Sequence, residues 1–307
     1  MKRISPALCM LIYLAFPAAP ALSAAVPGIE HLIVIGLDGM CSDGVRKTDT
    51  PNLHRLMKEG SWTLHARAVM PSSSSPNWAS MIMGAGPDKH GVTSNEWMPD
   101  KFDVPPTTIG PGGIFPTIFG VMRAQRPNSK IAVFHDWKDF GRLLETNAPN
   151  KLLHVKDALE TIADSIKYLK KEQPNFLFIH LDGVDHAGHG FGWRSTEYYK
   201  EVEMIDALIG AVLRTVHTMG LADKTLVLVT ADHGGLGTSH GGPSLEELEI
   251  PWILCGPGVR KGHEVKNPLH TYDTAATIAY IFGLQPPDCW IGKPVLEAFK
   301  PLGKARR

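Results

Sequence analysis

The chain has 307 residues, of which 43% are hydrophobic and 20% charged. This composition supports a large folded core and excludes an intrinsically disordered protein. Its 31 lysines and arginines equal its 31 aspartates and glutamates. Because there is no excess of positive charge, we expect no nucleic-acid binding.

The first residues have the three parts of a secretory signal peptide. Two basic residues follow Met1, a hydrophobic run extends from Pro6 to Leu22, and small residues occupy 23–25. Pro17 and Pro20 disfavour the alternative, an uncleaved membrane anchor. We therefore predict a signal peptide over residues 1–24, a periplasmic or secreted mature chain over residues 25–307, and no stable membrane insertion after cleavage.

Cleavage after residue 24 changes both the charge and the cysteine count. Lys2 and Arg3 leave with no acid, so 29 basic residues face 31 acidic ones, a net charge of −2. Cys9 also leaves, and three cysteines remain, Cys41, Cys255 and Cys289. If two of these three cysteines form a disulfide, the third keeps a free thiol. A Cys255–Cys289 disulfide and three free thiols are both open interpretations.

The first third of the chain predicts a strand and two helices. An apolar run from His31 to Leu37 is typical of a buried strand and ends at Asp38. Thr50 to Gly60 predicts a short helix, with threonine as N-cap, proline at the first position and glycine as the stop. Serines at 72–75 precede a second helix that extends to Met83.

Residues 86–130 are rich in glycine, proline and aspartate and lack periodicity until Ile114. We interpret residues 92–130 as an insertion that arches over the substrate site. Trp97, Phe102 and Phe115 are its candidate stacking residues, with core packing as the alternative for each.

Strands and helices alternate through the rest of the chain. The predicted strands are 131–134, 175–181, 225–231 and 250–255, and the predicted helices cover 159–169, 198–216 and 271–282. His135 and Asp136 follow one strand, either as a substrate contact or as a plain strand end. This alternation predicts an α/β fold, with a mostly parallel central sheet covered by helices on both faces.

Acidic residues follow three of the predicted strands. Asp38, Asp185 and Asp232 would share the carboxyl edge of the sheet, where ligands bind in open α/β folds. Three neighbouring carboxylates repel one another unless cations lie among them.

Histidines accompany two of these acids. His189 stands four residues after Asp185, His233 directly follows Asp232, and His240 lies a little further along the chain. Carboxylates and imidazoles together suit Zn²⁺ or Mn²⁺. The sequence therefore predicts a metal site built from these residues.

These motifs, taken in order, resemble the alkaline phosphatase superfamily, and most of all its type I phosphodiesterase/nucleotide pyrophosphatase branch. The resemblance includes a hydroxyl before Pro76-Asn77, His90-Gly91, Asp-x-x-Gly-His at 185–189 and Asp-His-Gly at 232–234. It implies a hydrolase of small-molecule phosphate esters with two divalent ions, Zn²⁺ or else Mn²⁺.

By this resemblance Ser74 is the nucleophile, a serine where the branch usually has threonine. The resemblance assigns one ion to Asp38, Asp232 and His233 together with Ser74, and the other ion to Asp185, His189 and His240. His263 and His270 remain alternatives to His240.

The chemistry of a serine nucleophile agrees with this assignment. A divalent cation lowers the pKa of a hydroxyl, and a helix N-terminus favours a phosphoryl anion. We expect Ser74 to form a phosphoserine and the Asn77 amide to donate to a phosphoryl oxygen.

Three other functions compete with a phosphodiesterase. A sulfatase of the superfamily needs arginine where Trp78 stands, so it is the second choice. A phosphomonoesterase would use the same residues. A metal-binding pseudoenzyme that captures a phosphorylated ligand is the alternative that is not an enzyme.

Overall fold

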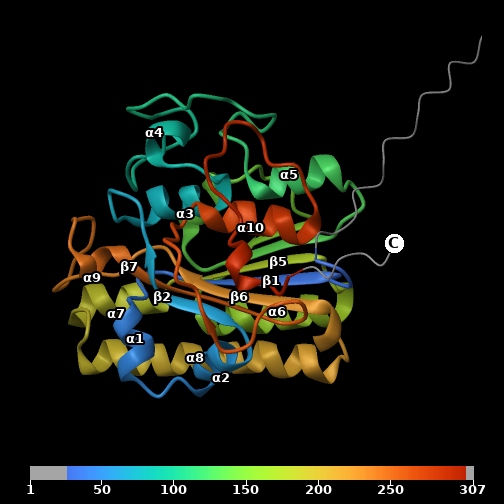
Figure 1. The fold of residues 1–307 in the computed structure, drawn as a ribbon. Coiled ribbons are helices and arrows are strands. Elements are labelled where there is room, and N and C mark those ends of the chain that lie inside the picture. The colour runs from blue at the N-terminus through green and yellow to red at the C-terminus, as the bar shows by residue number, and fades with distance from the viewer. Residues whose placement is uncertain (1–25, 302–307) are drawn as a thin grey trace, which may run out of the picture.

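The computed structural model describes residues 26–301, so the predicted signal peptide lies outside the described residues. The described chain forms three layers, with one eight-stranded sheet between two layers of helices (Figure 1). None of the helices described between residues 26 and 301 combines the length and apolar character that a membrane span needs.

The strand order in the sheet is β4-β3-β5-β1-β6-β7-β2-β8. The strands are β1 (His31–Leu37), β2 (Ser61–Arg67), β3 (Ile131–His135), β4 (Lys151–His154), β5 (Phe176–Leu181), β6 (Thr225–Ala231), β7 (Glu249–Cys255) and β8 (His263–Glu264). All pairings are parallel except those of β7, which is antiparallel to both β6 and β2. The predicted fold class, a mostly parallel sheet, is therefore confirmed.

Helices cover both faces of the sheet, as the sequence predicts (Figure 1). Above it lie α3 (Ser74–Met83), α4 (Pro87–His90), α5 (Ile118–Gln125) and α10 (Asp273–Phe282). Below it lie α1 (Ser42–Lys47), α2 (Pro51–Glu59), α6 (Ala158–Glu172), α7 (Gly183–Phe191) and α8 (Thr196–Thr218). The short α9 (Leu245–Leu248) lies at the left edge of the view.

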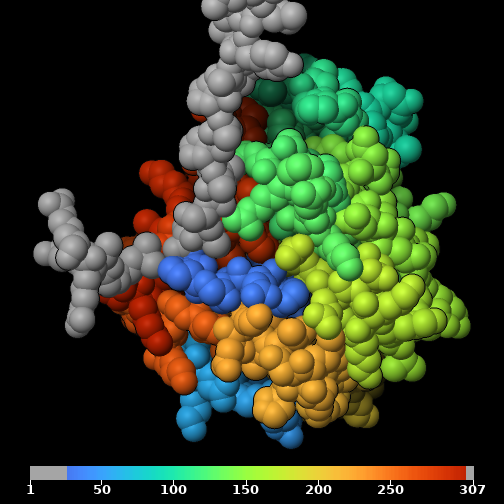
Figure 2. All heavy atoms as spheres, turned by 90° about the vertical axis from the view of Figure 1, so that its right-hand side faces the viewer, coloured from blue at the N-terminus to red at the C-terminus, as the bar shows by residue number. Residues whose placement is uncertain are grey.

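The two central strands explain why the parallel sheet forms. Every residue of β1 and of β6 is buried, and the two strands pair in register from His31↔Thr225 to Leu37↔Ala231. Since helices cover both faces, each strand must be apolar along its whole length. Both strands end on the left of Figure 1. Figure 2 shows the side of the molecule where they begin, and there the first described residues lie above the residues that join α8 to β6.

Periodicity did not reveal β2 and β4. β2 carries a register shift between Thr63 and Ala66 that interrupts its alternation of buried and exposed residues. β4 is a short edge strand with no fully buried residue, so it lacks an apolar run. Strong patterns mark central strands, and edge strands lack them.

The region predicted as an insertion contributes to both core and surface. Trp97 and Phe115 are buried in the hydrophobic core, whereas Phe102 is 41% exposed. The core alternative therefore holds for two of the three aromatic residues.

The three cysteines beyond the predicted signal peptide are free, so the Cys255–Cys289 disulfide is wrong.

Candidate metal centre and nucleophile

The predicted ligands converge at the carboxyl edge of the sheet. Asp38 follows β1, Asp232 and His233 follow β6, and Asp185 lies in the first turn of α7, which follows β5. Because β5, β1 and β6 are consecutive in the sheet, residues far apart in sequence meet there.

Ser74 lies beside two of these candidate ligands, Asp38 and His233. Its Oγ is 3.2 Å from His233 Nε2 and 3.5 Å from Asp38 Oδ1. The ligand atoms of Asp38, Asp185 and His233 all lie within 4.8 Å of one another, and all three side chains are buried. This group has the donor set that zinc or manganese accepts.

Asp232 borders the same group. Its Oδ1 accepts a hydrogen bond from the backbone N–H of Gly39 at 3.1 Å. Its Oδ2 lies 3.2 Å from His233 Nε2, yet it is buried without a hydrogen-bond partner. A buried carboxylate oxygen without a hydrogen bond is costly unless a cation compensates it.

The second group contains Asp185, His189 and His240, again within 4.8 Å of one another. Asp185 Oδ2 is 3.3 Å from His189 Nε2, and Asp185 Oδ1 is 3.8 Å from His240 Nε2. Asp185 Oδ1 is also buried without a hydrogen-bond partner. Since Asp185 belongs to both groups, two ions would lie side by side.

Backbone carbonyls hold the three imidazoles. The Nδ1 atoms of His189, His240 and His233 lie 2.9, 3.1 and 2.8 Å from the carbonyl oxygens of Thr238, Ser72 and Gly234. With a proton on Nδ1, each ring presents the lone pair of Nε2 to the carboxylates. Such outer contacts orient histidine ligands in metal sites.

The charges of this cluster also fit a cation. Burial, with the nearby charges of Asp38 and Asp182, raises the pKa of Asp185 to about 9, and burial with Asp38 raises that of Asp232 well above its usual value. Burial lowers the pKa of His233 to about 3, so its imidazole is neutral. Burial and the neighbouring negative charge thus disfavour the ionised form of these two carboxyl groups. A bound cation would favour that form, so the cluster is suited to a metal ion.

Asp38 behaves differently from the other two acids. Burial opposes its ionisation, but a hydrogen bond from His180, the nearby charge of the same imidazole and a hydrogen bond from Trp78 hold its pKa below the usual range. Asp38 is therefore the one carboxylate of the three that the surrounding protein keeps ionised.

The start of α3 leaves Ser74 Oγ available for chemistry. The N-cap is Ser73, and its own side chain makes no capping hydrogen bond. Ser74 is thus the first helical residue, and its hydroxyl faces His233 and Asp38 instead of the helix backbone. The positive end of the helix lies beside the hydroxyl.

The predicted role of Asn77 needs correction. The side chain is fully buried. Its Nδ2 donates to the carbonyls of Pro71 and Ser73 at 3.0 Å and lies 3.3 Å from that of Val69, while its Oδ1 accepts from the Val69 N–H at 2.7 Å. Both amide hydrogens are engaged, so Asn77 holds the loop before Ser74 and has none left for a phosphoryl oxygen.

Sequence reasoning missed Asn95 and Arg142, which lie beside the start of α3. Asn95 Oδ1 accepts the Ser75 N–H at 2.8 Å, and no described residue binds its Nδ2. Arg142 donates to the Asn95 carbonyl and lies 3.4 Å from Ser75 Oγ. Asn95 lies in a turn and Arg142 in the short 3-10 helix Lys138–Leu143, and neither segment has a periodic pattern that would mark it.

The other histidines considered from sequence lie elsewhere. His263 contacts Glu297 at 3.1 Å and His270 stacks on Tyr272, so His240 is the histidine that joins Asp185 and His189. His135 is buried against the Trp137 carbonyl, which leaves it as a structural residue.

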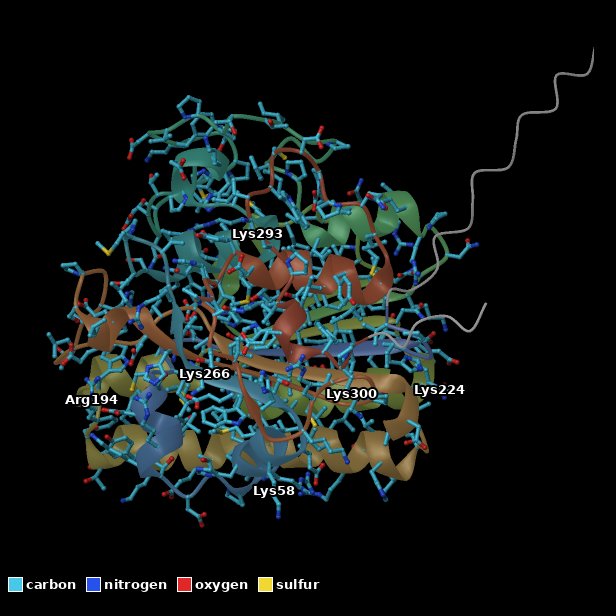
Figure 3. The ribbon with its side chains drawn as sticks, viewed as in Figure 1. Lys58, Arg194, Lys224, Lys266, Lys293 and Lys300 are labelled. Carbon is cyan, nitrogen blue, oxygen red and sulfur yellow. The ribbon has the colours of Figure 1, made fainter. Side chains whose placement is uncertain are left out.

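Arg194 ties the glycine-rich turn after Asp232 to α1. Its guanidinium lies 2.9 Å from Asp43 Oδ2 and 3.2 Å from the Gly235 carbonyl. Figure 3 shows it on the same side as α7, while Lys224 marks the opposite edge. The guanidinium of Arg194 thus stabilises the turn that follows the candidate ligands Asp232 and His233.

Comparison with known proteins gives a family match. A model described as type I phosphodiesterase/nucleotide pyrophosphatase matches residues 32–248. Among curated proteins, GPI ethanolamine phosphate transferase 1 of Yarrowia lipolytica is 27% identical over 320 residues, covering 88% of this chain and 34% of the relative. The chain therefore spans about a third of the length of this relative and of its counterpart in Saccharomyces cerevisiae.

Solved structures share the fold. Murine ectonucleotide pyrophosphatase/phosphodiesterase 5, an inactive variant in complex with AMP, aligns with a TM-score of 0.74 at 15% identity, over 88% of this chain and 100% of that chain. A variant of the alkaline phosphatase PafA aligns with a TM-score of 0.76 at 13% identity, over 90% of this chain and all of that one.

Proposed function

This chain belongs to the type I phosphodiesterase/nucleotide pyrophosphatase family, and from that premise we propose that it hydrolyses phosphodiesters through a phosphoserine on Ser74. The observation that carries the proposal is the position of Ser74 Oγ, 3.2 Å from His233 Nε2 and 3.5 Å from Asp38 Oδ1. The side chain of a serine that only capped the helix would accept a backbone N–H of the first turn, whereas Ser74 Oγ faces two candidate metal ligands.

We assign one zinc to Asp38, Asp232 and His233, and a second to Asp185, His189 and His240. The unpartnered oxygens of Asp185 and Asp232 support this assignment. Bound divalent cations would activate the hydroxyl and neutralise charge on the phosphoryl group. Manganese would suit the same donors.

The chain's own residues account for the two halves of the reaction. Ser74 Oγ loses its proton and attacks phosphorus, an Oγ–P bond forms, and the bond to the leaving group breaks, so that the alcohol departs with one proton. The N-terminus of α3 stabilises the phosphoryl anion, and Nδ2 of Asn95 is the amide beside it that no described residue engages. Water then cleaves the Oγ–P bond and restores the serine hydroxyl.

A phosphotransferase is the second candidate, and the likeness to GPI ethanolamine phosphate transferase 1 favours it. Its first half-reaction would be the same. An alcohol would replace water in the second half, so the two functions differ only in the acceptor.

Zinc-loaded protein should be assayed against bis(4-nitrophenyl) phosphate, 4-nitrophenyl phosphate and 4-nitrophenyl sulfate. We expect the diester to react fastest, and chelation to abolish turnover until zinc is restored. Added ethanolamine or glycerol as acceptor would raise the yield of phosphate diester if the chain is a transferase.

Ser74→Ala should abolish turnover and keep the metal content. Ser75→Ala, one residue along the same helix, is the matched control and should remain active. Full activity of Ser74→Ala would overturn the proposal. Conversion of Ser74 to formylglycine, detected by mass spectrometry of active protein, would favour a sulfatase. A metal-loaded chain that turns over none of these esters would favour a binding pseudoenzyme.

A further inference from the structure

The two oxygens of Asp38 face different partners. Oδ1 lies 3.5 Å from Ser74 Oγ and 3.4 Å from His233 Nε2, on the side of the proposed metal. Oδ2 accepts a hydrogen bond from Trp78 Nε1 at 2.8 Å and lies 3.2 Å from His180 Nε2. One oxygen is thus directed into the site and the other is held by the protein.

His180 is itself held from the far side by Asp136. Its Nδ1 lies 3.4 Å from Asp136 Oδ1, which also accepts the Asp182 N–H at 2.8 Å. Asp136 follows β3, His180 belongs to β5 and Asp38 follows β1, and these three strands are neighbours in the sheet. The contacts therefore form one line across the carboxyl edge, from Asp136 to Asp38.

Packing prevents His180 from turning away. The ring is fully buried, and its centroid lies 4.6 Å from that of Trp78, 5.0 Å from that of Phe140 and 6.0 Å from that of Trp137. An imidazole enclosed by aromatic rings and contacted by a carboxylate at each nitrogen has one orientation.

We propose that His180, oriented by Asp136, is a positioning residue that leaves Asp38 a single free oxygen, Oδ1, for the metal and the nucleophile. An unrestrained carboxylate rotates and binds a cation through either oxygen or both. With Oδ2 occupied, Asp38 binds through one oxygen, and the direction of that oxygen is set before the metal arrives. This inference rests on the proposed function, because it assumes that Asp38 is a metal ligand.

The neighbouring His135 provides a matched control. It lies one residue before Asp136, is 3% exposed and contacts the Trp137 carbonyl at 2.8 Å. It is the register partner of His180 across β3 and β5, but no side-chain hydrogen bond of the described residues joins its ring to Asp38 or His180. Substitution of His135 therefore tests the general effect of removing a buried histidine at this sheet edge.

The test is zinc titration of metal-free protein against a chromogenic chelator, for wild type, His180→Gln, Asp136→Asn and the control His135→Asn. We expect one of the two zinc dissociation constants to rise about 10- to 100-fold in His180→Gln and less in Asp136→Asn. The double variant His180→Gln/Asp136→Asn should lose no more zinc affinity than His180→Gln alone, because Asp136 acts through His180. His135→Asn should keep both constants.

A second readout is the visible spectrum of the cobalt-substituted protein. A changed geometry at Asp38 should alter the cobalt bands in His180→Gln and Asp136→Asn, and leave them unchanged in His135→Asn. Asp136→Asn preserves the acceptor for the Asp182 N–H, so it keeps the test decisive if His180→Gln fails to fold.

Unchanged dissociation constants and cobalt bands in folded His180→Gln and Asp136→Asn would overturn the inference and leave the proposed function standing. Equal losses in His135→Asn would also overturn it. Wild-type protein that binds two zinc ions and hydrolyses no ester would overturn the proposed function alone. Wild-type protein that binds no zinc would overturn both.

Discussion

Gly36→Ala should destabilise the protein through a single contact with Trp78. A Cβ at position 36 would lie 2.5 Å from Trp78 Cη2 and 2.6 Å from Cζ3, closer than carbon atoms approach. The indole cannot move aside, because it is fully buried, packs edge-on against Phe140 and Phe178, and donates to Asp38. Overpacking of this kind costs about 1–3 kcal/mol, and we expect the upper end because no flexible atom can yield.

The same geometry predicts a rescue. Phenylalanine at position 78 lacks the two ring carbons that meet the new methyl group. Trp78→Phe alone should cost at least about 1.5–3 kcal/mol, because it removes a hydrogen bond to a charged carboxylate. In that background Gly36→Ala should cost only about 1 kcal/mol or less, a coupling of about 2 kcal/mol between the two positions.

Urea unfolding of the four metal-free proteins measures this coupling. The Gly36→Ala protein should also melt roughly 5–10 °C below wild type. Gly190→Ala is the control, since a Cβ there meets nothing within 4 Å, and it should leave stability unchanged or raise it slightly. Additive effects of Gly36→Ala and Trp78→Phe would refute the reasoning, because they would show that the methyl group and the indole do not compete for the same space.

Three further predictions concern the loop before Ser74, a buried histidine and the metals. Asn77→Asp keeps the acceptor for the Val69 N–H but turns a carboxylate oxygen toward three carbonyls; we expect a loss of about 2–4 kcal/mol in urea unfolding, and wild-type stability would contradict the assigned role. Burial lowers the pKa of His90 from 6.5 to about 3, so the unfolded chain binds this proton first as the pH falls. The stability that the neutral ring contributes is fully present above pH 6.5 and is lost between pH 6.5 and about 3, by at most about 1.4 kcal/mol per pH unit, and His90→Asn should reduce this slope in unfolding curves at pH 7, 6 and 5. Zinc at 100 times its dissociation constant should add about 2.7 kcal/mol per site, so a melting temperature that is the same with zinc and with chelator would argue against the metal centre.

Local patterns in the sequence predict the core of the fold and most of the candidate ligands. The β1 strand is recognisable from His31 to Leu37 because a strand buried on both faces must be apolar throughout. Asp38 and Asp232 follow apolar strands directly, Asp185 follows one within four residues, and parallel strands bring such ends to one edge. The acids and their neighbouring histidines are therefore visible from short segments alone.

The roles of other residues depend on contacts that no segment contains. Asn77 has the same position in the chain whether its amide faces a phosphoryl oxygen or the carbonyls of the preceding loop, and only the path of residues 69–73 decides between them. His180 appears in sequence as one polar residue in an apolar strand. Its partners Asp38 and Asp136 lie 142 and 44 residues away, so its proposed positioning role depends on the order of the strands.

Sequence by itself thus determined the parallel core and the identity of the candidate metal ligands, because burial and strand ends leave local patterns in the chain. The tertiary structure alone decided which histidine completes the second group, what Asn77 holds and how Asp38 is oriented. These depend on distances between side chains from different strands and loops, and such distances exist only once the sheet has assembled.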